Sequence, residues 1–235
     1  MYFHPIEDPD AGHIGYLLAD AGSLDAVIID PPPRSTELLL ALLAERRFRL
    51  SHVLRTHVHA SQPLNCSALS ELTGATLVIA DGVGINAACP AKVERAVHGS
   101  TLVFGQEVLR VLATPGHTAH CVSYLWRDRL FCGDAFDLGS CGDAFDLGSC
   151  VDGGDDADAG LLYDSLTCRL FMLPEQTLVF PAHPLRGRRV ATLGELRLRS
   201  APLLTGSRDA FITDMTSRRA ALLRHARPSP PAKRR

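Results

Sequence analysis

The chain has 235 residues, a formal net charge of −2 and a hydrophobic fraction of 46%. The balanced charge argues against a nucleic-acid partner, which would call for a basic surface. No apolar run is long enough to span a bilayer, and no basic start leads into an apolar segment. We therefore expect a cytoplasmic protein with no membrane association.

The cysteine content also agrees with a cytoplasmic protein. The count is odd, and no Cys-x-x-Cys pair is present. We expect reduced thiols rather than a disulfide framework. The cysteines are Cys66, Cys89, Cys121, Cys132, Cys141, Cys150 and Cys168.

The first elements are two apolar strands and a helix. Residues 14–18 and 26–30 read as strands, and Ser35 is expected to cap a helix that runs to about Arg46. Its buried face is expected to hold Leu38, Leu39, Leu42 and Leu43. Further strands are predicted at 50–54, 76–80, 103–113 (a hairpin), 122–126, 130–132 and 177–180, and helices at 64–72, 158–171 and 208–224.

Mixed strands and helices of this kind predict a layered α/β protein. The length suits one domain, which we place at residues 1–224 with its C-terminal helix at about 208–224. Residues 225–235 are basic and rich in proline, so we expect a disordered tail.

Two histidines follow the strand at 50–54, in the stretch Thr56-His57-Val58-His59. On extended backbone, residues two apart point to the same side, so both imidazoles can reach one metal ion. Three later apolar runs also end in a ligand-type residue, namely His117, Asp134 and His183. The pattern predicts a metal site at one edge of a sheet. The other histidines, His4, His13, His52, His98, His120 and His225, are read as structural or exposed.

This ligand order resembles the metallo-β-lactamase superfamily. The opening Met1-Tyr2-Phe3-His4, the Thr114-Pro115-Gly116-His117 loop and the stretch Gly187–Glu195 resemble its persulfide dioxygenase branch, a neighbour of the glyoxalase II hydrolases. The resemblance covers about residues 1–215. It implies an αββα sandwich, a metallo-β-lactamase-like domain and assembly as a homodimer.

The chain departs from the superfamily pattern His-x-His-x-Asp-His at Ser61 and Gln62. A hydroxyl and a neutral amide are poor ligands for the second ion of two-metal members, so we expect one metal per chain. His57, His117 and Asp134 then form the two-histidine, one-carboxylate set of non-haem Fe(II) oxygenases. The resemblance implies Fe(II) on these three residues, with His59 and His183 beside them.

One nine-residue unit occurs twice in succession, as residues 132–140 and 141–149. It supplies a second carboxylate, Asp143, as the alternative metal ligand. Asp134 is preferred because it directly follows a predicted strand. Arg186 is the expected substrate-binding residue.

The resemblance implies oxidation of glutathione persulfide, or a related small persulfide, by O₂ and water to sulfite and the thiol. Two alternatives stay open. One is a mononuclear zinc hydrolase of thioesters, using His57, His59 and His117. The other is a binding protein with little or no catalytic activity.

Overall fold

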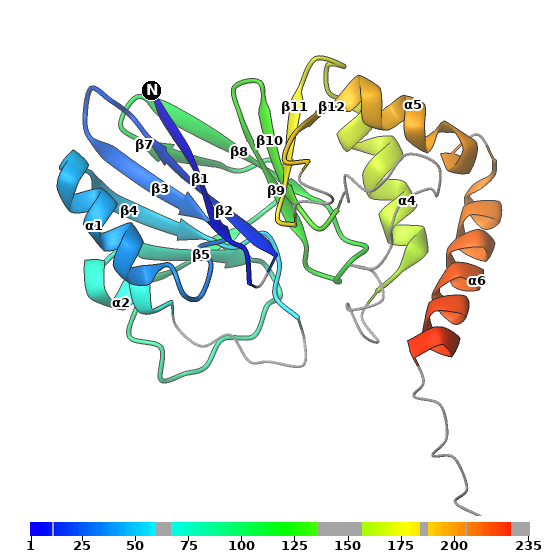
Figure 1. The fold of residues 1–235 in the computed structure, drawn as a ribbon, viewed down its shortest axis with the longest axis horizontal. Coiled ribbons are helices and arrows are strands. Elements are labelled where there is room, and N and C mark those ends of the chain that lie inside the picture. Colours follow the sequence, from blue (N-terminus) through cyan, green and yellow to red (C-terminus); the bar gives the residue numbers. More distant parts are fainter. Residues whose placement is uncertain (11, 60–66, 136–156, 184–187, 205, 227–235) are drawn as a thin grey trace, which may run out of the picture.

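The structure, a computed structural model, describes residues 1–10, 12–59, 67–135, 157–183, 188–204 and 206–226. Across these residues, two six-stranded sheets face each other and helices lie on the outer faces (Figure 1). Helices α1 and α2 cover the first sheet, and α4, α5 and α6 lie beside the second. The αββα sandwich expected from the sequence is confirmed.

The first sheet has the order β1-β2-β3-β4-β5-β6. Its first three strands are antiparallel, and β3 to β6 are parallel. The carboxyl ends of parallel strands meet at one edge, which is where ligands are commonly bound. The strands are β1 (Tyr2–Asp8), β2 (His13–Ala19), β3 (Asp25–Ile29), β4 (Arg49–Leu54), β5 (Thr76–Ala80) and β6 (Val93–Ala96).

The second sheet has the order β12-β11-β10-β9-β8-β7. All its neighbours are antiparallel except β10 and β11, which run parallel and so end together. The strands are β7 (Thr101–Phe104), β8 (Glu107–Ala113), β9 (Val122–Trp126), β10 (Arg129–Gly133), β11 (Leu178–Pro181) and β12 (Ala191–Thr192).

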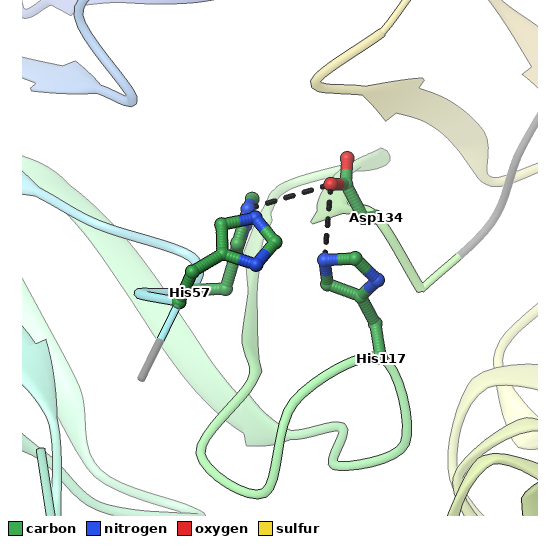
Figure 2. Close-up of side chains that lie close together, drawn as sticks. His57, His117 and Asp134 are labelled. Carbon is green, nitrogen blue, oxygen red and sulfur yellow. Dashed lines mark ion pairs between the residues drawn. The ribbon is translucent and has the colours of Figure 1, made fainter. Parts of the chain in front are cut away.

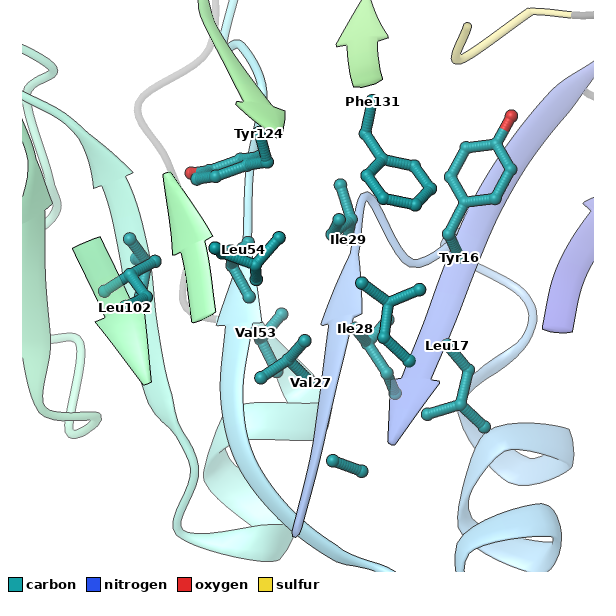
Figure 3. Close-up of a cluster of buried hydrophobic side chains, with 14 of the residues drawn as sticks. Tyr16, Leu17, Val27, Ile28, Ile29, Val53, Leu54, Leu102, Tyr124 and Phe131 are labelled. Atoms are coloured by element: carbon teal, nitrogen blue, oxygen red, sulfur yellow. The ribbon is translucent and has the colours of Figure 1, made fainter. Parts of the chain in front are cut away.

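The main hydrophobic core lies between the sheets and beneath α1 (Figure 3). The strand β3 is buried at every residue because its two faces contact different layers. By contrast, β7 alternates between buried and exposed residues, so one face of this edge strand is open to water. The pattern of apolar residues thus reports how many layers cover each strand.

A second hydrophobic cluster lies between the second sheet and the C-terminal helices. It includes Leu162 and Leu166 of α4 together with Phe211 and Met215 of α6. The helices are α1 (Thr36–Arg46), α2 (Ala68–Thr73), α4 (Ala159–Cys168), α5 (Leu193–Leu204) and α6 (Arg208–Ala226), with a 3₁₀ turn at Leu170–Met172.

The residues that bound α1 and α2 differ in how well they match common helix-capping patterns. Gly74 ends α2 in the left-handed conformation, which glycine adopts without steric cost. Ser35 stands before α1, but its hydroxyl donates to the carbonyl of Pro32 instead of capping the helix. Leu38 was expected on the buried face and is exposed, because α1 buries only the Leu39–Leu43 stripe.

Two further expectations need correction. Cys89 is disulfide-bonded, so the cysteines are not all reduced, although Cys121, Cys132 and Cys168 are free. The last helix extends to Ala226, past the expected start of the tail, and residues 227–235 lie outside the described part of the chain. Among the described residues, no helix has both the length and the apolar character needed to cross a membrane.

One buried hydrogen bond joins the two sheets close to the ends of their strands. The Tyr16 hydroxyl of β2 donates to the carbonyl of Pro181 in β11 at 2.5 Å. The Tyr16 ring also packs against Phe131 and Phe180. Burial raises the pKa of Tyr16 well above its usual range, so the phenol stays protonated and remains a donor.

We expect Tyr16→Phe to lower the free energy of unfolding by about 1–2 kcal/mol, because the Pro181 carbonyl loses its donor while staying buried. Urea denaturation measures the change. Tyr163→Phe is the matched control, since the Tyr163 hydroxyl makes no hydrogen bond in the described structure while its ring contacts Phe211. Equal stability of the two variants would contradict the role given to the Tyr16 hydroxyl.

Candidate metal centre

The predicted ligands follow four strand ends that meet at one edge of the sandwich. His57 and His59 come after β4 of the first sheet, and His117 follows β8 of the second. Asp134 and His183 follow β10 and β11, whose parallel pairing sets Gly133 opposite Pro181. The two sheets therefore supply different ligands to one place.

Four of these side chains converge closely. Ligand atoms of His57, His59, His117 and Asp134 all lie within 4.8 Å of one another. Asp134 Oδ2 is 3.4 Å from His57 Nε2 and 3.3 Å from His117 Nε2 (Figure 2). The three imidazole rings stand nearly perpendicular to each other, with centroids 5.0–5.1 Å apart. Such convergence from separate strands is typical of a metal centre.

His183 lies at the rim of this group. Its Nε2 is 3.7 Å from Asp134 Oδ2, and its side chain is 47% exposed. Its Nδ1 is 2.8 Å from the carbonyl oxygen of Gly12. Since a carbonyl can only accept, Nδ1 carries a proton, and Nε2 is the nitrogen that faces Asp134.

The same reasoning fixes the proton on His57. The Thr56 hydroxyl donates to Asp30 Oδ2 at 2.6 Å, while the Thr56 backbone N–H donates to Asp30 Oδ1. With its only proton used, the hydroxyl must accept from His57 Nδ1, which is 3.0 Å away. Nε2 is therefore the nitrogen of His57 that faces Asp134. A carboxylate that orients a ligating histidine through a hydroxyl is a familiar support of metal sites.

His117 is buried, at 1% exposure, and neither of its ring nitrogens has a hydrogen-bond partner among the described residues. Burial, joined by the charges of His57, His59 and His183, lowers its pKa to about 4, although Asp134 acts in the opposite sense. The ring is therefore neutral at pH 7. A buried polar group without a partner is costly, so these nitrogens indicate a missing ligand.

Asp134 is the buried acid of the group. Burial by itself would raise the pKa of Asp134, but the charges of His57, His183 and His117 outweigh this and lower it. The carboxylate is thus ionised, and the Nε2 atoms of His57 and His183 face it. A cation shared by these groups would stabilise the arrangement, so the residues fit a divalent metal ion with imidazole and carboxylate ligands.

Several predicted residues cannot be placed. Asp143, the alternative carboxylate, and Arg186, the expected substrate-binding residue, lie outside the described residues, as do Ser61 and Gln62. Asp134, in contrast, is part of the cluster. The preference for Asp134 as metal ligand stays a prediction.

Three residues beside the cluster were not predicted from the sequence. His13 was read as structural, yet its ring centroid is 5.3 Å from that of His183. Thr56 and Asp30 were not singled out, although they orient His57. A signal existed for Asp30, since it closes a strand of the parallel part of the sheet, where functional residues gather. No local pattern marks His13.

Curated relatives support one branch of enzymes. The chain is 32% identical to the protein of Bos taurus named persulfide dioxygenase ETHE1, mitochondrial, over 88% of this chain and 78% of that protein. The Homo sapiens protein of the same name is 33% identical, over 85% and 74%. A hydroxyacylglutathione hydrolase of Rhodospirillum rubrum is 30% identical, over 72% and 60%. No protein-family model matches the chain.

Solved structures agree. The crystal structure of ETHE1 from Myxococcus xanthus is 34% identical, with a TM-score of 0.76 over 98% of this chain and 93% of that one. A metallo-β-lactamase from Staphylococcus aureus has a TM-score of 0.74 at 23% identity, over 98% and 69%. The second likeness concerns the fold alone.

Gly133 allows the two sheets to approach at the cluster. It has a φ of +55°, and a Cβ there would lie 2.3 Å from Thr56 Oγ1 and 2.7 Å from Thr56 Cβ. We expect Gly133→Ala to displace Thr56 and His57 and to weaken metal binding by about tenfold or more. Metal titration of the purified variant measures this.

Gly99→Ala is the control for that experiment. Gly99 has a φ of +82° but nothing within 4 Å of an added Cβ. It should therefore show only the backbone cost of about 1 kcal/mol, with unchanged metal affinity. Equal metal affinity of the two variants would refute the steric argument.

His117 should make the stability of the metal-free protein depend on pH. Because its folded pKa of about 4 is below the ordinary 6.5, the unfolded chain binds the proton more readily. Stability is then lost as pH falls from about 6.5 to about 4, by up to about 3 kcal/mol. Urea denaturation at several pH values, with His117→Asn alongside, measures this. The variant should lose much of that pH dependence, and identical slopes would disprove it.

Proposed function

The chain belongs to the persulfide dioxygenase branch of the metallo-β-lactamase superfamily, and on that basis we propose that it oxidises a small persulfide with O₂. The proposed reaction takes glutathione persulfide, or a related low-molecular-weight persulfide, with O₂ and water to sulfite and the free thiol. The observation that carries it is the pair of histidines, His57 and His117, whose Nε2 atoms both face one oxygen of the buried Asp134.

In this proposal, His57, His117 and Asp134 hold one Fe(II). Two histidines and a carboxylate on one side leave the remaining coordination positions open. When bound, the iron supplies the redox chemistry that joins O₂ to the sulfur. His59 and His183 are the further residues that we predict to be close to the ion.

In the proposed mechanism, the side chains of the protein orient the metal ligands and supply negative charge. Asp30 and Thr56 hold the His57 ring with its Nε2 inward. Asp134 supplies the negative charge that offsets part of the charge of a divalent ion, and its burial strengthens that interaction. Together these groups define the site before any ligand arrives.

Among the described residues, the side chains of the site are open to solvent on one side only. His117 and Asp134 are buried, and the His57 side chain is 11% exposed, whereas His183 is half exposed. In the proposed reaction the substrate therefore approaches past His183, and the buried side excludes water from the sulfur. His59 and His183 are placed to hydrogen-bond a water or an oxygen of the substrate.

One observation favours a second candidate, a zinc hydrolase of thioesters. His57, His59 and His117 are mutually close with perpendicular rings, which is also the arrangement of a three-histidine zinc site. Related hydroxyacylglutathione hydrolases act as the precedent. The third alternative is a binding protein without catalytic activity. The presence of the four-residue ligand cluster favours the two enzymatic alternatives over it.

We expect protein purified anaerobically without added metal to contain about one iron per chain and to consume O₂ when given glutathione persulfide. His117→Ala should lose the iron and at least about 99% of this activity, because it removes a ligand. Elemental analysis and an oxygen electrode measure both. Iron retained in full by His117→Ala would exclude the assignment.

His59→Ala separates the two enzymes. It should lower persulfide oxidation only in part, by about tenfold, because His59 lies beside the proposed iron ligands. It should abolish thioester hydrolysis at a zinc ion that depends on His59. Zinc in the purified protein with thioesterase activity and no oxygen uptake would favour the hydrolase.

A further inference from the structure

The buried His117 has no hydrogen-bonded group that orients its ring, unlike two other residues of the metal centre. His57 and His183 each have a hydrogen-bond partner at Nδ1. Neither ring nitrogen of His117 has a hydrogen-bond partner among the described residues. The position of the His117 ring therefore depends on the backbone that leads into it, residues 113–116.

Two side chains of helix α4 donate hydrogen bonds to the backbone of residues 113–116. The Ser165 hydroxyl donates to the carbonyl of Pro115 at 2.7 Å. Nη1 of Arg169, the residue that follows the last turn of the helix, donates to the carbonyl of Ala113 at 2.9 Å. Ser165 is fully buried, so bulk water cannot replace its hydroxyl as a donor.

The start of α4 contacts the same segment through its backbone. The N–H of Asp158 donates to the carbonyl of Gly116 at 2.8 Å. Gly116 also packs so closely on the helix that an added Cβ would lie 2.5 Å from Leu162 Cβ and 2.6 Å from Leu162 Cα. The residue immediately before His117 is thus held directly against α4.

The four residues at α4 that make these contacts lie on one face of the helix. Their spacing follows the helical period, at i, i+4, i+7 and i+11. The contacts run antiparallel, because the start of the helix meets Gly116 and its end meets Ala113. We call this face the α4 stripe, and it consists of Asp158, Leu162, Ser165 and Arg169.

Helix α4 is itself held in place by neighbouring parts of the structure. Leu162 and Leu166 belong to the second hydrophobic cluster. Arg208 of α6 donates to both carboxylate oxygens of Asp164, at 2.9 and 3.0 Å. A helix that is packed in this way can define the position of the loop that it contacts.

We propose that the α4 stripe positions His117 in the metal centre, with Ser165 and Arg169 as positioning residues. The proposal rests on the proposed function in taking His117 as a metal ligand. Because no side chain orients the His117 ring, a shift of residues 113–116 is passed directly to its ligand atom. Loss of donors on the α4 stripe should therefore weaken metal binding, as loss of an outer partner of a metal ligand generally does.

The test adds Co(II) to the metal-free full-length protein, because the ligand-field absorption bands of this ion depend on the arrangement of its ligands. We expect Ser165→Ala/Arg169→Met to bind Co(II) about tenfold more weakly than the wild type and to shift these bands. Each single variant should bind Co(II) about threefold more weakly. Competition with a chelator measures the affinity, and absorption spectroscopy of the loaded protein measures the bands.

Two further variants separate positioning from general destabilisation. Ser200→Ala removes another buried hydroxyl, which donates to the carbonyl of Leu196 within α5. It should lower the free energy of unfolding of the metal-free protein about as much as Ser165→Ala does, by about 1 kcal/mol, with unchanged Co(II) affinity and bands. Arg169→Lys keeps a donor and should recover part of the affinity that Arg169→Met loses.

Unchanged Co(II) affinity and bands in folded Ser165→Ala/Arg169→Met would overturn the proposal. Should this double variant not fold, the same result in the two single variants would overturn it. An equal loss of Co(II) affinity in Ser200→Ala would also overturn it, because the effect would then follow stability alone.

The proposed reaction fails in a different way, since Co(II) binding involves neither a persulfide nor O₂. Absence of persulfide-dependent oxygen uptake by the iron-loaded wild type, together with weaker Co(II) binding in the α4 stripe variants, would reject the reaction and keep the positioning role. A wild type that binds no Co(II) would overturn the positioning role, whatever its activity.

Discussion

The arrangement of the site depends on one buried negative charge, that of Asp134. A carboxylate in this position is costly unless positive charge lies close to it. Here its neighbours are imidazoles, and two of them, His57 and His183, turn Nε2 toward it because their Nδ1 atoms are committed to Thr56 and Gly12. A shared cation would be held by the carboxylate and by these nitrogens together. The outer hydrogen bonds therefore orient the ligands for a metal ion.

Asp30 supports the centre through a neighbouring hydroxyl. Its carboxylate holds Thr56, and through Thr56 it orients the ring of His57. The conformation at the end of β3 therefore sets the orientation of a metal ligand that follows the adjacent strand, β4.

The sequence predicted the site best where an apolar, strand-like run ends directly in a residue that can bind a metal ion. Apolar runs ending in His57, His117, Asp134 and His183 predicted both the strand ends and their convergence, because strands of the two packed sheets end at a common edge. His13 escaped prediction, since its role comes from the packing of β2 against Ala182, a contact between residues far apart in the chain. Leu38 was misplaced for a related reason: α1 contacts its sheet along a narrower stripe than its composition suggests.

The ligands of the centre are divided between the two sheets, with His57 and His59 on one and His117, Asp134 and His183 on the other. A bound ion would therefore act as a cross-link between two halves that otherwise meet through apolar contacts and a few hydrogen bonds, such as that of Tyr16. Separation of the sheets and loss of the ion become a single event. In such an arrangement a bound metal would stabilise the fold as well as serve the reaction. Any motion that separates the two sheets would also break the metal site.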